Sequence, residues 1–286
     1  MCTLENPAVI NISISDYILT PASCASLVNE VMKNLLYQRA QIPYPYAWLK
    51  NIVKKKRKSL EEGEEENKNN FTLSKHYQTV STAYDAVENI TSNIVKCFTG
   101  LGDNLKEVIF VIGVTPVCPK EVFTVKASSL ALGHVEGNHV MENSRRQSRI
   151  LRSIFLEEVW MNLVENSLPC CNTYIFLRIE GSEKNLSNVC NDSIFIPSKP
   201  LLVSNKIKQT VINFNYVNSQ VFSCCDKMEV FKDTCDVENS EKCERNFNFN
   251  QKEKSTENKE MWLQSTILVR GFKDCFINKV SASELW

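Results

Sequence analysis

Glycine is scarce in this sequence, with 8 residues in 286, whereas an average protein has about 7% glycine. Loops that cradle phosphate groups need glycines at fixed spacing, because the backbone must approach the phosphate closely. The sequence contains no G-x-x-x-x-G-K-S/T motif, and it also lacks the H-E-x-x-H, G-x-S-x-G and EF-hand motifs. These absences argue against a nucleotide-dependent enzyme and against the common hydrolase classes.

An excess of charge of either sign is also missing, since 33 basic residues balance 33 acidic ones. Nucleic-acid-binding domains usually carry a basic excess that neutralises phosphates, so we predict no nucleic-acid partner. The longest unbroken apolar run lies near Val108–Ile112 and is far shorter than the ~20 residues that span a bilayer. We therefore expect no membrane partner.

The twelve cysteines include no C-x-x-C pair, so the spacing predicts neither a zinc site nor another metal cofactor. The N-terminus lacks the basic start and apolar core of a secretory signal. We therefore expect an intracellular chain with reduced thiols.

The N-terminal region contains a predicted edge strand and a predicted helix. Apolar and polar residues partly alternate at Val9–Ile14, which is typical of a strand. Thr20 and Pro21 indicate a helix start, with Thr20 as the N-cap. The residues that follow form one apolar stripe at spacings of three and four: Cys24, Leu27, Val28, Val31 and Leu35. Two prolines, Pro43 and Pro45, end this helix.

Residues 54–70 combine a run of five basic residues, at 54–58, with five glutamates between 61 and 66. Burial cannot offset the ordering entropy of so charged a segment, so we predict a disordered linker. The basic run is either a nuclear-import signal or half of a self-neutralising, solvated loop. A second polar stretch, at 232–260, is rich in Asn, Lys and Glu and predicts another disordered loop.

The strongest periodicity in the sequence predicts one long helix from Leu73 to about Phe98. Its apolar residues follow an a/d pattern: Leu73, Val80, Val87 and Ile94 in one register, and Tyr77, Tyr84 and Phe98 in the other. The helix forms either a coiled coil or the central helix packed on a sheet, and the strands predicted directly after it favour the second. Gly100 and Gly102 mark its end.

Five later segments have the composition of strands: Glu107–Val114, Lys120–Ala127, Asn172–Glu180, Ile207–Val217 and Met261–Phe272. The order of helices and strands predicts an α+β fold, with helices gathered on one face of a mainly antiparallel sheet.

A further helix is predicted from Arg145 to Asn166, and its apolar residues do not form a single stripe. They fall into three rows: Ile150 and Ile154; Leu151, Phe155 and Val159; Leu156, Trp160 and Leu163. One row can face the core. A second row is either exposed, which suggests a partner surface, or buried on the other side of the helix.

The only candidate catalytic set is a thiol with nearby imidazoles. Thiol hydrolases pair one cysteine with a histidine and an orienting Asn or Asp. Cys118 with His134 or His139 and Asn138 is the one set that lies close together in the sequence. The alternative is an inert, buried cysteine at a strand end.

Four blocks of the sequence stand out together: Leu36–Arg39 with Gln41–Tyr46 and Leu49–Lys50; Pro119–Glu121 with Phe123; Leu151–Phe155; and Trp262, Gln264, Gly271 and Phe272. In this order they resemble blocks of the comet family, the HORMA-like proteins that bind the spindle checkpoint protein Mad-two. The first resembles the end of the family's first helix, the second its Pro-Lys-Glu strand opening, the third its interface helix and the fourth its closing segment.

The resemblance implies a single HORMA-like domain at 21–274, preceded by an N-terminal segment at 1–20 and followed by a tail at 275–286. A C-terminal segment would cross the sheet as a safety belt. The resemblance implies no catalysis and no cofactor. It implies binding to the closed conformer of Mad-two, and presentation of Mad-two to the pachytene-checkpoint AAA+ ATPase, which dismantles the mitotic checkpoint complex.

The family's interface glutamine falls on Gln38, and its aromatic anchor falls on Leu151, where this chain has an aliphatic residue instead. Phe155 lies one turn later in the same row, and Arg152 adds a charge that can form a strong hydrogen bond at the rim. The family's ATPase contact falls near Pro197 and Lys199, which Ser198 separates here.

The resemblance therefore implies a checkpoint-silencing adaptor of nucleus and cytoplasm, associated with spindle and kinetochore in mitosis. Two alternatives remain at this point. One is another HORMA-class scaffold, meiotic or repair-related, that binds a closure peptide. The other is the thiol enzyme.

Overall fold

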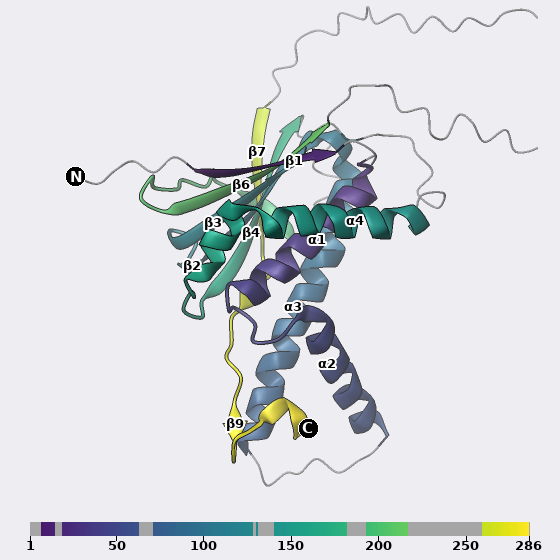
Figure 1. The fold of residues 1–286 in the computed structure, drawn as a ribbon, viewed down its shortest axis with the longest axis vertical. Helices are drawn as coiled ribbons and strands as arrows, with labels where there is room; N and C mark the ends of the chain where they lie inside the picture. The colour runs from purple at the N-terminus through teal and green to yellow at the C-terminus, as the bar shows by residue number, and fades with distance from the viewer. Residues whose placement is uncertain are drawn as a thin grey trace, which may run out of the picture.

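A computed structural model describes residues 7–14, 19–62, 71–127, 130, 140–181, 193–216 and 259–285. Eight of the described strands form one large sheet in the order β1-β6-β3-β2-β4-β7-β5, with β8 paired to β4 (Figure 1). The strands are β1 (Ala8–Ile14), β2 (Leu105–Thr115), β3 (Cys118–Lys126), β4 (Asn172–Gly181), β5 (Phe195–Ser198), β6 (Lys208–Tyr216), β7 (Lys259–Ser265) and β8 (Val269–Arg270).

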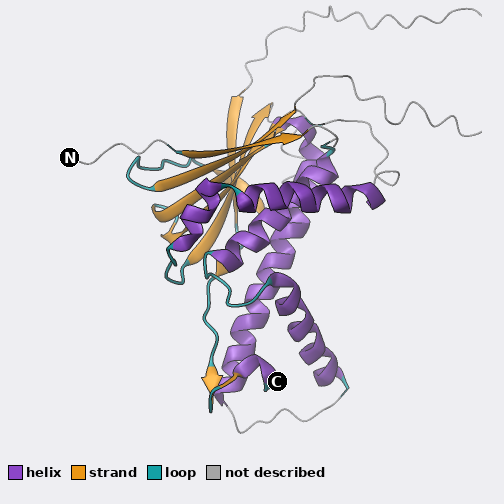
Figure 2. Ribbon diagram, in the orientation of Figure 1, coloured by secondary structure: helices purple, strands orange, loops and turns teal. Residues whose placement is uncertain are grey.

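Among the described strands most pairs are antiparallel, and only β6 pairs in parallel, with β1 and with β3. The helices lie beside this layer of strands (Figure 2). They are α1 (Pro21–Gln38), α2 (Tyr46–Glu61), α3 (Phe71–Leu101), α4 (Val140–Leu156) and α5 (Glu158–Glu165), with the short helices η1 (Gly102–Asn104) and η3 (Ala282–Glu284). This arrangement confirms the predicted α+β fold with a mainly antiparallel sheet backed by helices.

The alternation of side chains along β2 explains why the two faces of the sheet are different. Phe110 and Ile112 point to the face that packs against the helices, while Ile109 and Val111 join a smaller apolar cluster on the other face. Residues from 201 to 207 cover that second cluster. Both faces of the central strand are therefore buried, as its unbroken apolar sequence requires.

The helix predictions at the N-terminus and in the middle of the chain are confirmed. Thr20 caps α1, because its hydroxyl accepts a hydrogen bond from the backbone N–H of Ser23 at 3.2 Å. In α3 the predicted a/d residues Val80, Val87 and Ile94 are all buried. Gly102, directly after α3, has φ +53°, a left-handed conformation that glycine adopts without strain. The long helix packs against α1 and the sheet, which confirms the second interpretation of its periodicity.

Most strand predictions are confirmed within a few residues, but Met261–Phe272 is divided into β7 and β8, and three short strands were not predicted: β5, β9 (Phe276–Ile277) and β10 (Val280–Ser281). β1 lies at an edge of the sheet, as its alternating pattern predicts. β5 was not predicted, because four residues that include a proline carry no periodicity. Lys259 and Glu260, at the end of the predicted loop 232–260, already belong to β7; the rest of that loop lies outside the described residues.

The prediction of a disordered linker at 54–70 is wrong for residues up to Glu61, which continue helix α2. Val53 is fully buried, and Arg57 donates two hydrogen bonds to the Asp85 carboxylate on α3, at 2.8 and 2.7 Å. The buried Val53 and the paired Arg57 therefore hold the helix against the rest of the protein. The lysines of the basic run are spread around the helix. Residues 63–70 lie outside the described part, and the import signal stays a prediction.

The prediction of one continuous helix over 145–166 is also wrong. Glu157 adopts an extended conformation between α4 and α5, with ψ 135°. The break changes the phase of the helical wheel, so Leu156 and Trp160 do not share a face. Leu156 is 64% exposed, whereas Trp160 is fully buried. In the first row, Ile150 and Ile154 are buried, as predicted for a core row.

Candidate functional site

Gln38 is the last residue of α1, and its side chain is already engaged within the protein. Its Oε1 accepts a hydrogen bond from the indole Nε1 of Trp160 at 2.6 Å. Because Trp160 is completely buried, this acceptor satisfies a donor that could not otherwise reach water. Within the described residues, the amide nitrogen of Gln38 has no hydrogen-bond partner. Gln38 as a whole is half-buried, next to Trp160 of α5.

Phe155 reaches the same indole from α4. The centroids of the Phe155 and Trp160 rings are 5.2 Å apart, and Phe123 of β3 lies behind Trp160 at 6.1 Å. Two residues predicted to contact Mad-two, Gln38 and Phe155, are therefore brought together by Trp160. We call Gln38, Phe123, Phe155 and Trp160 the indole cluster.

The other two predicted contact residues lie on α4 next to the indole cluster. Leu151 is half-buried one turn before Phe155 and packs against the main core. Arg152 is exposed. Figure 1 shows α4 crossing α1, and Ser26 of α1 donates a hydrogen bond to Gln147 of α4 at 3.2 Å. The predicted set thus forms one surface made of α4 and the end of α1.

A buried ion pair directly after Gln38 fixes this surface to the sheet. Arg39 is 1% exposed, and it donates two hydrogen bonds to the Glu121 carboxylate, from Nε at 2.8 Å and from Nη2 at 2.6 Å. Its Nη1 donates to the carbonyls of Leu163 and Asn166 at 2.9 and 2.8 Å. One guanidinium therefore joins the end of α1, strand β3 and the end of α5.

The C-terminal segment is tied to the same corner of the molecule. Gln41 Oε1 accepts a hydrogen bond from the backbone N–H of Cys171 at 2.7 Å, and the Gln41 carbonyl accepts one from Phe272 at 2.9 Å. Gly271 donates to the Cys171 carbonyl at 2.8 Å. A Cβ at position 271 would lie 2.4 Å from that carbonyl oxygen, so only glycine fits this crossing.

Beyond Gly271 the chain runs beside α3 and ends near α2 (Figure 1). Asp274 lies 3.5 Å from His76 Nε2 on α3. Burial lowers the pKa of His76, and the nearby Asp274 carboxylate opposes that shift. Ser281, in the short β10 (Val280–Ser281) that pairs with β9 (Phe276–Ile277), shares a hydrogen bond with the Tyr44 hydroxyl at 3.2 Å. Burial, reinforced by a hydrogen bond to Asp274, raises the pKa of Tyr44 to about 12.

The predicted ATPase contacts lie at the other end of the sheet. Pro197 is exposed in β5 and Lys199 is exposed directly after it. β5 forms one edge of the sheet, whereas α4 and α5 contact β1 at the opposite edge. The structure therefore does not bring Pro197 and Lys199 together with the indole cluster.

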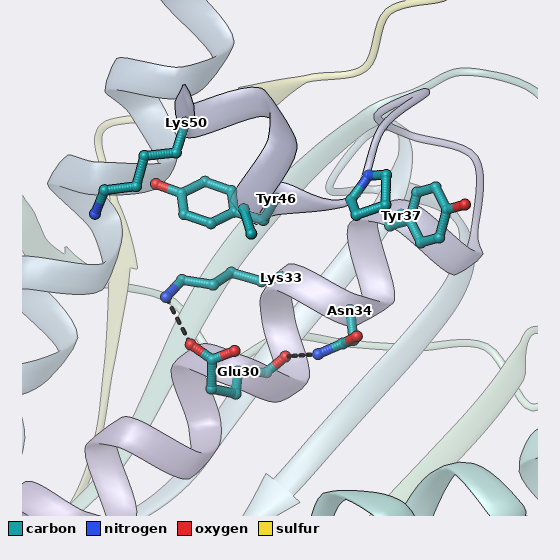
Figure 3. A pocket seen from close by; sticks show the side chains of 8 residues that line it. Glu30, Lys33, Asn34, Tyr37, Tyr46 and Lys50 are labelled. Atoms are coloured by element: carbon teal, nitrogen blue, oxygen red, sulfur yellow. Dashed lines mark hydrogen bonds and ion pairs between the residues drawn. The ribbon is translucent and has the colours of Figure 1, made fainter. Parts of the chain in front are cut away.

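A pocket of about 340 Å³ opens between α1 and the start of α2 (Figure 3). Its charged groups are paired with one another or with α3. Lys33 binds Glu30 at 2.8 Å and lies 5.0 Å from the centroid of the Tyr46 ring, and Lys50 binds Glu88 at 3.6 Å. Tyr46 also donates a hydrogen bond to Glu88, which together with burial raises the pKa of Tyr46. The pocket is a gap between paired side chains with no group directed at a ligand.

The candidate thiol site is only partly described. Cys118 is exposed at the start of β3, so the alternative of a buried cysteine is wrong. His134, Asn138 and His139 lie outside the described residues. In the described ranges, no group of three or more His, Cys, Asp or Glu side chains could hold a metal ion. None of the described helices is long and apolar enough to cross a membrane.

Sequence reasoning missed the two groups that organise this corner, Trp160 and the Arg39–Glu121 pair. A signal for the pair existed, because Glu121 lies two residues before Phe123 and four before Val125, on the core face of β3. A carboxylate on an apolar face needs a buried cation or donor. For Trp160 the signal was hidden, since the break at Glu157 cannot be read from the apolar pattern.

The sheet with helices on one face, and the C-terminal segment that crosses from the sheet to the helices, define an α+β domain of the HORMA-like class. Residues 10–180 match the family described as p31comet: Mad1 and Cdc20-bound-Mad2 binding. This match covers more than half of the chain, which therefore belongs to the p31comet family.

A human relative, the MAD2L1-binding protein, is 25% identical over 140 residues. The aligned part is 49% of this chain and 49% of the human protein, so the match spans about half the length of that relative.

Proposed function

We propose that this chain is a non-enzymatic adaptor that binds the closed conformer of Mad2 and presents it to a AAA+ ATPase. Disassembly of the mitotic checkpoint complex would then silence the spindle checkpoint. Membership of the p31comet family carries the proposal, and the matched region, 10–180, contains all four proposed contact residues: Gln38, Leu151, Arg152 and Phe155.

In this proposal each contact residue has a distinct role. The Gln38 amide nitrogen is positioned by the bond from its oxygen to Trp160, and it donates to a backbone carbonyl of the partner. Leu151 and Phe155 supply apolar area beside it. Arg152 supplies a charge at the rim, where arginine is often used in interfaces. No step in this function needs a cofactor.

The ATPase would approach a different surface. Pro197 and Lys199 are exposed at the β5 edge of the sheet, away from α4. Two separate surfaces would let the adaptor hold Mad2 and the ATPase at the same time. We place the proposed activity in nucleus and cytoplasm, with association to spindle and kinetochore in mitosis.

The test is co-elution on a sizing column with Mad2 locked closed and, separately, with Mad2 locked open. We expect a complex with the closed form only. Binding to neither form would contradict the proposal and favour a HORMA-class scaffold for closure peptides instead.

The matched variants are Gln38→Ala with Leu151→Ala, and Gln38→Glu alone. The double variant should lose binding. Gln38→Glu keeps an acceptor for Trp160 but removes the amide donor, so it should weaken binding while the thermal midpoint stays close to wild type. Full binding by the folded double variant would refute the proposed surface. Lys199→Glu, at the far edge, serves as the control and should bind closed Mad2 normally.

A further inference from the structure

Helix α4 exposes a row of three arginines on the side opposite its buried residues. Arg145, Arg149 and Arg152 are all exposed, and their spacing of four and three residues places them along one face of the helix. Leu156, 64% exposed, continues the row by one more turn. We call these four residues the arginine row. At a rise of 1.5 Å per residue, its arginines extend over roughly 10 Å.

The arginines of this row have no partner among the residues that the structure describes. No ion pair or hydrogen bond is formed by Arg145, Arg149 or Arg152 within the described ranges, in contrast to Arg39 and Arg57. Three like charges at neighbouring positions of a helix repel one another. Within the described ranges the row is therefore a positive surface without a counter-charge, and an acidic partner would stabilise it.

We propose that the arginine row is a docking element for a protein surface that carries carboxylates at matching helical spacing. The proposal deepens the proposed function and rests on it: the carboxylates would belong to the face of closed Mad2 that covers Leu151 and Phe155. Arginine suits this role because its planar guanidinium forms two parallel hydrogen bonds to a carboxylate. The row thereby steers the approach of the partner and sets its orientation on α4.

The surroundings of the row favour an acidic protein over a nucleic acid. Glu157 and Glu158 are exposed directly after the row, and their charges would repel a phosphate backbone that continued along the helix. Leu156 ends the row with an apolar side chain, and a partner protein can bury it. The whole chain carries no net positive charge.

The experiment measures the association and dissociation rates of closed Mad2 with the full chain at several salt concentrations. The variant is Arg145→Glu with Arg149→Glu, which leaves the four residues of the proposed contact set intact. The control is Lys75→Glu with Lys96→Glu, the same change of charge at two exposed positions of α3. We expect the α4 variant to associate about tenfold more slowly at low salt and to show a flatter salt dependence. The control should associate within twofold of wild type.

The outcomes separate this inference from the proposed function. If the wild-type chain binds closed Mad2, and the α4 variant and the control associate with it at equal rates, the arginine row is not a docking element. The adaptor function would then still stand. A failure of the wild-type chain to bind closed Mad2 would overturn both. A 20-base-pair DNA duplex is the competing probe. Duplex binding that the α4 variant loses, without any effect on Mad2 rates, would identify a nucleic-acid surface and contradict the proposal.

Discussion

Arg39 and the three arginines of the arginine row lie in opposite environments. Arg39 is buried, and it donates four hydrogen bonds, two to the Glu121 carboxylate and two to carbonyls at the end of α5. Arg145, Arg149 and Arg152 are exposed on α4 and have no ionic partner in the described part of the chain. The same type of side chain thus stabilises the fold in one region and remains available for a partner in the other.

The difference follows from what lies around each group. A guanidinium out of contact with water needs a counter-charge and hydrogen-bond acceptors, since an unpaired buried charge is strongly unfavourable. A guanidinium in water loses little by remaining unpaired, because solvent screens it. Removal of a buried arginine contact should therefore change stability, and removal of an exposed one should change association.

The largest expected effect is on the buried pair. Glu121→Ala leaves Arg39 charged and without its carboxylate, and it should lower the free energy of unfolding by about 3–5 kcal/mol. The measurement is urea denaturation followed by circular dichroism. Replacement of both partners, Arg39→Met with Glu121→Met, should cost less than Glu121→Ala. A loss below about 1 kcal/mol for Glu121→Ala would contradict the role given to this pair.

A smaller loss of stability is expected at Gln38, which both bonds to the buried Trp160 and belongs to the proposed contact set. Gln38→Ala leaves the buried Trp160 N–H without an acceptor, which should cost about 1–3 kcal/mol of stability. Gln38→Glu retains the acceptor and should cost less. Thermal melts compare the stability of the two variants with that of wild type, and tryptophan fluorescence is the local probe. Equal stability of the alanine variant and wild type would mean that the indole finds another partner.

His76 is buried, and its Nε2 lies 3.5 Å from the Asp274 carboxylate. Because the pKa of His76 is lowered by burial, the unfolded chain takes up a proton below about pH 6.5 while the folded chain resists it. Stability from this group is therefore present above pH 6.5 and is lost as the pH falls through that value, by at most about 1.4 kcal/mol per pH unit.

The check is the urea midpoint at pH 7.5 and at pH 5.5, for wild type and for His76→Gln at constant ionic strength. The two proteins differ only at position 76, so the difference between their profiles reports on His76 and its contact with Asp274. The variant should show the flatter profile. A steeper acid loss in the variant would reverse the assigned direction of the pKa shift.

The smallest effect on stability is expected in the arginine row. Arg149→Ala removes an exposed side chain without an ionic partner, and the free energy of unfolding should change by no more than about 0.5 kcal/mol. It should nevertheless slow the association with closed Mad2. A loss of stability comparable to that of Gln38→Ala would show that Arg149 supports the fold and would erase the contrast with Arg39.

The sequence predicts most elements of this fold because their patterns are local. Thr20 and Pro21 determine the start of α1, and the a/d residues of α3 follow one another at fixed intervals. The errors arise where a distant residue decides the outcome. Arg57 orders part of a charged segment only because Asp85 of α3 lies opposite it, and nothing within 54–70 indicates this.

The sequence predicts which residues belong to the candidate surface, but it does not predict the contacts that join them. Gln38, Leu151, Arg152 and Phe155 are named from the sequence, and they lie on one surface. The link between Gln38 and Phe155 is Trp160, whose position depends on the extended conformation of Glu157. A single break of a helix changes which side chains share a face, and the apolar pattern around it contains no proline or glycine that would mark the break.

The central claim is that closed Mad2 covers α4 and the end of α1 and leaves the β5 edge free. Hydrogen exchange of the backbone amides, followed by mass spectrometry with and without closed Mad2, tests this most directly. The account predicts slower exchange over 145–156 and around Gln38 in the complex, and unchanged exchange over 195–199. Protection of the β5 edge, with α4 unchanged, would contradict it.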